Sequence, residues 1–364
     1  MLPGASFNGR SFLGTLALVA FAIGGLFIVD TFLVKMEQAE DRAEAARLFA
    51  EGRKLMDQGR SADAVERLND AVAIERNNRE YRLALAEALL AAGRLDDAES
   101  KLNDLLQEDS TDGAANLMMA RVMVREGKIT EGISFYHRAI YGRWTNQAAQ
   151  NRDAARFELI DLLVRQNAKE DLLAELLPLQ DEALDDLATR KKIGRLFIVA
   201  GSPARAAEVF RAILRRHPQD ADAYAGLGEA EFASGNYPTA QTDFITASRL
   251  NPDDETVRKR LDLCNQVLAL NPTRRGLDPA ERYRRSHQLL EMALDEANHC
   301  SGAQELLDEA AKAVKRAVPA SRQGEVSEMD IDLAEQIWQA RKKDCKQESA
   351  VPEALDLVLA KLAQ

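Results

Sequence analysis

The sequence repeats itself with a period of 34 residues, and this period constrains the fold more than any other feature. The clearest unit runs from Ala221 to Asp254, and only one insertion of six residues, before Asp153, interrupts the series. A period of this length is typical of supersecondary units that stack on their neighbours, so we expect an extended array and no single large core. The units begin at Ala45, Arg79, Gly113, Asp153, Leu187 and Ala221.

The fifteenth position of each unit predicts a sharp turn between two helices. Glycine or asparagine occupies it in every unit, and these residue types tolerate the positive φ that ends a helix abruptly. Each unit is therefore expected to be a helical hairpin. The residues at this position are Gly59, Gly93, Gly127, Asn167, Gly201 and Gly235.

Three further positions indicate how the helices pack. Small residues dominate positions eight and twenty, which lets paired helices approach closely. The unit from Asp153 departs from this rule, with Ile160 and Leu172. Position twenty-four is bulky throughout, so we expect it to fill the space between successive hairpins. Its residues are Leu68, Leu102, Tyr136, Leu176, Phe210 and Phe244.

This pattern resembles the tetratricopeptide-repeat (TPR) family, most closely in the last two units. The resemblance implies an all-α protein, a right-handed α-solenoid of six TPR helical hairpins. Residues 255–270 repeat the first-helix pattern without a turn glycine and are expected to cap the array, which then covers 45–270. The predicted units are 45–78, 79–112, 113–146, 153–186, 187–220 and 221–254.

Residues 277–364 carry no family motif and are predicted to form a C-terminal helical region. Asp278 and Pro279 supply an N-cap and first-turn signal for the first of its helices. The polar stretch Pro319–Ser327 is expected to be a loop. The predicted helices cover 279–298, 302–317, 330–345 and 352–362.

The segment 11–34 is predicted to be a transmembrane helix, between an N-terminal tail (1–10) and a helical connector (35–44). Its 18 residues from Phe12 to Val29 carry no charge and would span roughly 27 Å as a helix. A cleaved signal peptide is the alternative. Ala20 and Gly24 are spaced so that two such helices could form a homodimer.

The three cysteines bear on the compartment. Cys264 falls on an apolar helical stripe and is expected to be buried and inert. Cys300 and Cys345 each close a predicted helix in a polar context, which leaves a disulfide or two unpaired thiols as alternatives. The disulfide would favour a periplasmic array over a cytoplasmic one, in a single-pass membrane protein.

The resemblance also implies a binding groove lined by fixed positions of each first helix. Read at those positions, the sequence combines apolar residues with a basic centre, in a chain whose net charge is −11. We expect a protein or peptide ligand with apolar anchors and acidic residues or a terminal carboxylate. The alternative is that these cations pair with neighbouring acids on an ordinary solvated face. The predicted groove residues are Phe49, Arg53, Leu83, Leu117, Arg121, Arg125, Phe157, Arg165, Lys191, Arg195 and Phe232.

Nothing in the sequence indicates nucleic acid, a cofactor, a metal or catalysis. The negative net charge disfavours a phosphate backbone as ligand. No P-loop, dinucleotide-binding turn or zinc-protease motif occurs, and the four histidines are scattered. We therefore expect no enzyme.

These features together predict a bacterial membrane-anchored TPR scaffold that positions a partner protein at the membrane, for instance in envelope assembly or secretion. Two alternatives remain open. One is a cytoplasm-facing organiser of a protein complex, and the other is a structural subunit held in a larger complex by its transmembrane helix.

Overall fold

The protein is all-helical in the computed structural model, which describes residues 9–181, 186–298, 304–344 and 352–363. Within these ranges the only β-type pairing is an isolated bridge between Asp112 and Arg143. The all-α prediction is therefore confirmed. Two compact units make up the chain, unit 1 from Met1 to Leu162 and unit 2 from Leu163 to Gln364.

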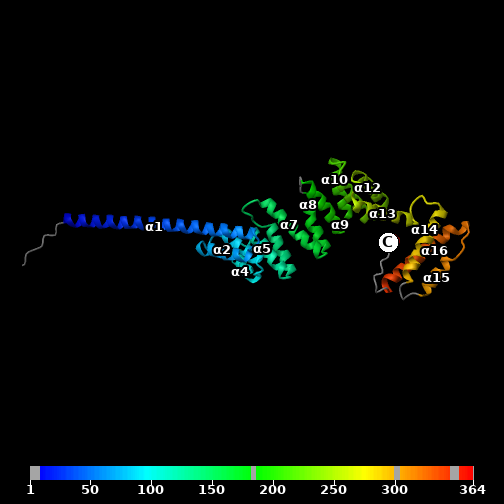
Figure 1. Cartoon of the computed structure of the whole chain (residues 1–364), viewed down its shortest axis with the longest axis horizontal. Helices are drawn as coiled ribbons and strands as arrows, with labels where there is room; N and C mark the ends of the chain where they lie inside the picture. Colours follow the sequence, from blue (N-terminus) through cyan, green and yellow to red (C-terminus); the bar gives the residue numbers. More distant parts are fainter. Residues whose placement is uncertain (1–8, 182–185, 299–303, 345–351, 364) are drawn as a thin grey trace, which may run out of the picture. The chain divides into compact units, whose positions relative to one another are not determined.

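Unit 1 contains the helices of the first three predicted hairpins and most of α7 (Figure 1). A single helix, α1, runs through the N-terminal region, and its C-terminal part packs against α2. The helices are α1 (Gly9–Asp57), α2 (Ser61–Ile74), α3 (Arg79–Ala91), α4 (Leu95–Glu108), α5 (Gly113–Arg125), α6 (Ile129–Ile140) and α7 (Ala148–Arg165).

Unit 2 continues the hairpins and ends in a separate group of helices around α14 and α16. The repeat-like helices are α8 (Lys169–Asp181), α9 (Leu187–Val199), α10 (Pro203–Arg216), α11 (Ala221–Ala233), α12 (Tyr237–Leu250) and α13 (Glu255–Leu270). The remaining elements are α14 (Pro279–Ala297), α15 (Gln304–Val314), the 3₁₀ helix η1 (Ala320–Arg322), α16 (Gln323–Asp344) and α17 (Glu353–Leu362).

The turn of each hairpin has the backbone conformation that the fifteenth position predicts. The glycines there have φ between 73° and 79°, and Asn167 has φ 53°. These are left-handed values that most side chains rarely adopt, which explains the restriction to glycine and asparagine. The turn prediction is confirmed at Gly59, Gly93, Gly127, Asn167, Gly201 and Gly235.

Phe210 shows how one hairpin packs on the next in unit 2. Its ring is fully buried and touches Gly194 of its own hairpin and Gly226 of the following one. A Cβ atom at Gly226 would lie 2.2 Å from the ring carbon Cζ, and one at Gly194 would lie 2.7 Å from it. The bulky position twenty-four therefore fills the space between hairpins, as predicted.

The predicted loop at 319–327 is wrong in part, because α16 begins at Gln323. Val326 and Asp330 are almost fully buried, and Asp330 Oδ2 lies 3.2 Å from Nδ1 of His287 on α14. Packing of α16 against α14 therefore extends the helix through a stretch that its polar composition alone marks as a loop. Only η1 and its flanks remain non-α-helical there.

The predicted single-pass membrane localisation is wrong. Within the described part of the chain, no helix has an apolar stretch long enough to cross a bilayer. The described side chains of α1 include Asp30, and from Lys35 onward charged residues recur in almost every turn, which lowers the hydropathy of every window that extends past Val29. The transmembrane helix predicted at 11–34 is therefore wrong, and so is the periplasmic placement of a single-pass membrane protein.

Two other predictions fall on residues outside the described part of the structure. The homodimer contact rests on the side chains of Ala20 and Gly24, which are not described. The disulfide rests on Cys300 and Cys345, which lie in the undescribed segments 299–303 and 345–351. Cys264, by contrast, is fully buried as predicted, and burial raises the pKa of its thiol to about 11.

Replacing Gly226 with alanine should destabilise unit 2 by about 1–3 kcal/mol, because the added methyl group overpacks the Phe210 ring. Gly324→Ala is the matched control, since no atom lies within 4 Å of a Cβ there and helix propensity predicts a gain of about 0.5–1 kcal/mol. Urea unfolding followed by circular dichroism measures both. Equal midpoints for the two variants would contradict the packing argument.

Candidate functional site

The first helices of unit 1 carry the apolar residues that the sequence assigns to the binding surface. Phe49 on α1 and Leu83 on α3 are partly exposed, whereas Leu117 on α5 is only 7% exposed. The Phe49 ring stacks on Tyr81 with 4.7 Å between centroids. We call the surface formed by these three residues and the charged residues between them the first-helix face of unit 1.

A ladder of alternating charges crosses this face from α1 to α7. Arg53 Nη1 lies 2.5 Å from Glu87 Oε2 on the next first helix. Arg121 binds Glu158 with two hydrogen bonds, of which the one from Nε is 2.9 Å long. The bond to Glu158 is the main cause that raises the pKa of Arg121, and Glu87 adds to it electrostatically. We call Arg53, Glu87, Arg121 and Glu158 the charge ladder.

Arg125 and Phe157 complete the predicted residues of unit 1. Arg125 Nη1 donates a 2.5 Å hydrogen bond to the Leu90 carbonyl oxygen, which ties α5 to α3. Phe157 on α7 is partly exposed. The face therefore joins partly exposed apolar side chains to cations that already have partners within the chain.

In unit 2 two of the three predicted cations are also engaged. Lys191 Nζ lies 2.7 Å from Asp220 Oδ2 and 3.4 Å from Asp222 Oδ2, and Arg195 lies 3.2 Å from Asp222. Arg165 on α7 is exposed and forms no ion pair within the described ranges. The predicted basic centre is therefore largely neutralised by acids of the chain itself, which is the alternative that the sequence left open.

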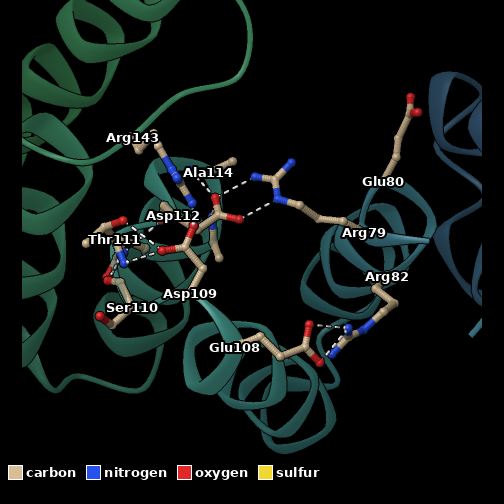
Figure 2. A network of polar contacts seen from close by, with 12 residues as sticks. Arg79, Glu80, Arg82, Glu108, Asp109, Ser110, Thr111, Asp112, Ala114 and Arg143 are labelled. Atoms are coloured by element: carbon tan, nitrogen blue, oxygen red, sulfur yellow. Dashed lines mark hydrogen bonds and ion pairs between the residues drawn. The ribbon is translucent and has the colours of Figure 1, made fainter. Parts of the chain in front are cut away.

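Asp112 organises a second polar network, at the start of α5 (Figure 2). Its carboxylate accepts hydrogen bonds from the backbone nitrogens of Ala114 (3.0 Å) and Ala115 (3.1 Å), so it caps the helix. Arg79, at the start of α3, donates two hydrogen bonds of 2.5 Å to the same carboxylate. Because Asp112 is 3% exposed, it couples two successive hairpins through a nearly buried charge.

Asp109 lies beside this network and binds the segment after α6. Its carboxylate accepts a 2.7 Å bond from Thr111 Oγ1 and a 2.5 Å bond from Arg143 Nη2. These bonds, first that from Thr111 and then that from Arg143, lower its pKa to about 2. Arg143 also pairs with the turn through its backbone, since Gly113 N donates to Arg143 O (2.8 Å). The α6–α7 connection is thereby attached to the α4–α5 turn.

The sequence did not identify Asp112, although a signal was available. An asparagine or aspartate immediately precedes five helices that begin repeats or cap them, and its side chain accepts backbone hydrogen bonds in each case. An asparagine or aspartate at the last position of a unit therefore predicts the N-cap of the helix that follows. These residues are Asn78, Asp112, Asp186, Asp220 and Asp254.

Comparison with known families supports the repeat assignment in two segments. Two sequence profiles described as tetratricopeptide repeat match the chain, one over residues 191–255 and the other over 55–122 and 89–141. The matched residues include Glu87 and Arg121 of the charge ladder, Asp112 with Arg79, and Phe232, whereas Arg53 and Glu158 lie outside them.

Individual relatives are similar over short stretches. Superkiller complex protein 3 of Mus musculus is 35% identical over 75 residues, which is 21% of this chain and 5% of that protein. Superkiller protein 3 of Schizosaccharomyces pombe is 33% identical over 123 residues, or 31% of this chain and 9% of the relative. The chain thus spans less than a tenth of the length of these curated relatives.

Solved structures of TPR proteins align with parts of this chain at low sequence identity. YrrB, described as a TPR protein with an unusual peptide-binding site, is 19% identical with a TM-score of 0.40, over 53% of this chain and 96% of YrrB. The C-terminal part of a TPR repeat-containing protein from Cytophaga hutchinsonii is 13% identical with a TM-score of 0.47, over 65% of this chain and 92% of that chain.

Asp112→Asn should cost about 1–3 kcal/mol, because asparagine still caps α5 but no longer supplies a charged acceptor for Arg79. Asp112→Ala should cost about 1 kcal/mol more, since the cap is lost as well. Asp254→Asn is the matched control, because Asp254 caps α13 but receives no arginine within the described ranges. Urea unfolding would contradict the coupling role if the two asparagine variants were equally stable.

Asp109 should titrate at about pH 2, and Thr111→Val should move its pKa back toward 3.8 by removing the Thr111 Oγ1 donor. A depressed pKa in the folded state means that this carboxylate stabilises the fold above about pH 4 and loses that contribution as the pH falls toward 2. Carboxyl carbon chemical shifts measured by NMR against pH give both values. An unchanged pKa in the variant would show that Thr111 is not a cause.

Proposed function

Since this chain carries tetratricopeptide repeats over residues 55–141 and 191–255, we propose that it is a protein-interaction scaffold whose first helices bind a segment of another protein. The observation that carries the proposal is the charge ladder beside Phe49 and Leu83 on the first-helix face of unit 1. Apolar anchors flanked by ordered charges are what peptide recognition requires.

The partly exposed apolar residues supply the affinity in this proposal. Phe49 and Leu83 already rest on neighbouring side chains, so a ligand side chain that covers them removes apolar surface from water without reordering the helices. Because the surface is already formed, binding an extended or helical segment costs the array little conformational entropy.

The charge ladder supplies the specificity. Arg53 and Arg121 keep about a third or more of their side-chain surface exposed, so an acidic group of a ligand can bind them in competition with Glu87 or Glu158. Exposed ion pairs of this kind are individually weak, which makes such an exchange inexpensive. The preferred ligand is therefore a peptide segment with apolar residues and an acidic residue or terminal carboxylate. The proposal assigns no catalytic residue and no cofactor.

A peptide library displayed on phage and selected on the purified full chain tests the proposal. Peptides selected on the wild type should bind Leu83→Asp at least tenfold more weakly, because the substitution puts an unpaired charge among the anchors. Arg53→Ala should lower the affinity for peptides that carry an acidic residue about twofold to fivefold. Fluorescence anisotropy measures both.

Ile74→Asp on the second helix α2 is the matched control, since Ile74 is 37% exposed and lies outside the first-helix face. It should bind the selected peptides as the wild type does. Circular dichroism must show that all three variants remain folded. A library that yields no specific peptide, or peptides that distinguish none of the variants, would refute the proposed binding surface.

A further inference from the structure

The C-terminal helix α17 packs against α13 and shares one apolar cluster with Phe232, a binding-position residue of the sixth repeat. Phe232 and Glu229 on α11 stand at positions twelve and nine, the positions of Met56 and Arg53 in the first repeat. Met56 is partly exposed and the Arg53 side chain is 44% exposed, whereas Phe232 is only 9% exposed. Other residues of the chain therefore cover Phe232.

Arg260 connects the covered residues to α17. It lies 2.9 Å from Glu229 and 5.7 Å from the centroid of the Phe232 ring. The same guanidinium lies 3.6 Å from Glu353, the first residue of α17. Arg260 thus forms ion pairs with both Glu229, the acid at position nine, and Glu353 at the start of the C-terminal helix.

Lys361 holds the other end of α17 on the same hairpin. Its Nζ donates a 2.5 Å hydrogen bond to the carbonyl oxygen of Gly235, in the turn between α11 and α12. The same ammonium lies 5.0 Å from the centroid of the Tyr237 ring. Tyr237 packs edge-on against Phe232. Each end of α17 therefore contacts a residue that packs beside Phe232, Arg260 at one end and Tyr237 at the other.

Between these ends α17 buries two adjacent apolar pairs, Ala354 with Leu355 and Val358 with Leu359. They join one apolar cluster with Phe232 and with buried residues of α13, α14 and α16. A helix of ten residues is not stable alone in water, so α17 is ordered by this contact, as a bound peptide would be. The polar contacts to Lys361 and Glu353 remain exposed and can be exchanged.

We propose that α17 is an internal ligand of this end of the array, and that the external partner it excludes is a short amphipathic helix of the same pattern. That pattern is an acidic first residue, two apolar pairs four residues apart and a lysine near the C-terminus. The inference rests on the proposed function, since it names the ligand class for the α11 and α13 part of the surface. It makes the C-terminus an autoinhibitory segment.

Fluorescently labelled peptide 351–364 is the probe, with the full chain as receptor. Leu355→Asp with Leu359→Asp in the chain removes the apolar contact of α17 and opens its site. The labelled peptide should bind this chain at least tenfold more tightly than it binds the wild type, in which the site is occupied. A peptide with the same two aspartates should not bind either chain.

A charge exchange tests the orientation. Arg260→Glu in the opened chain should weaken the peptide about twofold to fivefold, and a Glu353→Arg peptide should recover the loss. If the opened chain keeps the helicity of the wild type and binds the peptide no better, the proposal is overturned. Library peptides that depend on Leu83 would still support the proposed function, so the two failures are distinguishable.

Should the double variant lose its fold, a specific protease site inserted between residues 345 and 352 of the wild-type chain replaces it. After cleavage, the labelled peptide should exchange with the cut segment, and gel filtration should show it with the protein. A cut segment that stays bound and never exchanges would show that α17 is a fixed part of the core, and would overturn the proposal.

Discussion

The close approach of small residues to one bulky side chain is the constraint on which the rest of the array depends. Phe210 lies between Gly194 and Gly226, while Gly228 faces Phe244 and Gly52 faces Leu68 in the same manner. In each case a Cβ atom would come within 2.2–2.8 Å of the neighbouring side chain. Because this packing uses one side of these first helices, their positions five, nine and twelve can interact with residues of other repeats or with ligands.

Electrostatic contacts between repeats use those remaining positions. Arg53 with Glu87, Arg121 with Glu158, and Glu229 with Arg260 each join consecutive first helices. Most of these side chains are partly exposed, so each pair contributes little to the stability of the fold. In the proposed function they act on recognition, because they fix where cations and carboxylates stand beside the apolar residues, and a ligand would have to satisfy or replace them.

Local sequence rules predict the repeats. Features that depend on contacts between residues distant in the sequence are not predicted in this way. The turn at Asn167 follows from the tolerance of asparagine for positive φ. The extension of α16 through residues 323–327 does not, because it depends on the packing of α16 against α14, which is distant in the sequence. Pairing of Arg121 with Glu158 likewise escapes sequence reasoning, since many acids lie at suitable separations and only the packed helices select one. Asp112 was readable as an N-cap, but its buried contact with Arg79 was not.

The same repeat position has different consequences in the two units. In unit 1, Arg121 at position nine pairs with Glu158 of the next repeat. Leu83 on the same face is partly exposed. In unit 2, Glu229 at position nine pairs with Arg260, which also reaches Glu353 of the C-terminal helix. An external helix at that site must wait until α17 leaves, so its apparent affinity falls in proportion to the fraction of molecules that are open. Any substitution that weakens the binding of α17 to its site therefore raises the apparent affinity of the external helix, without altering a residue that this helix contacts.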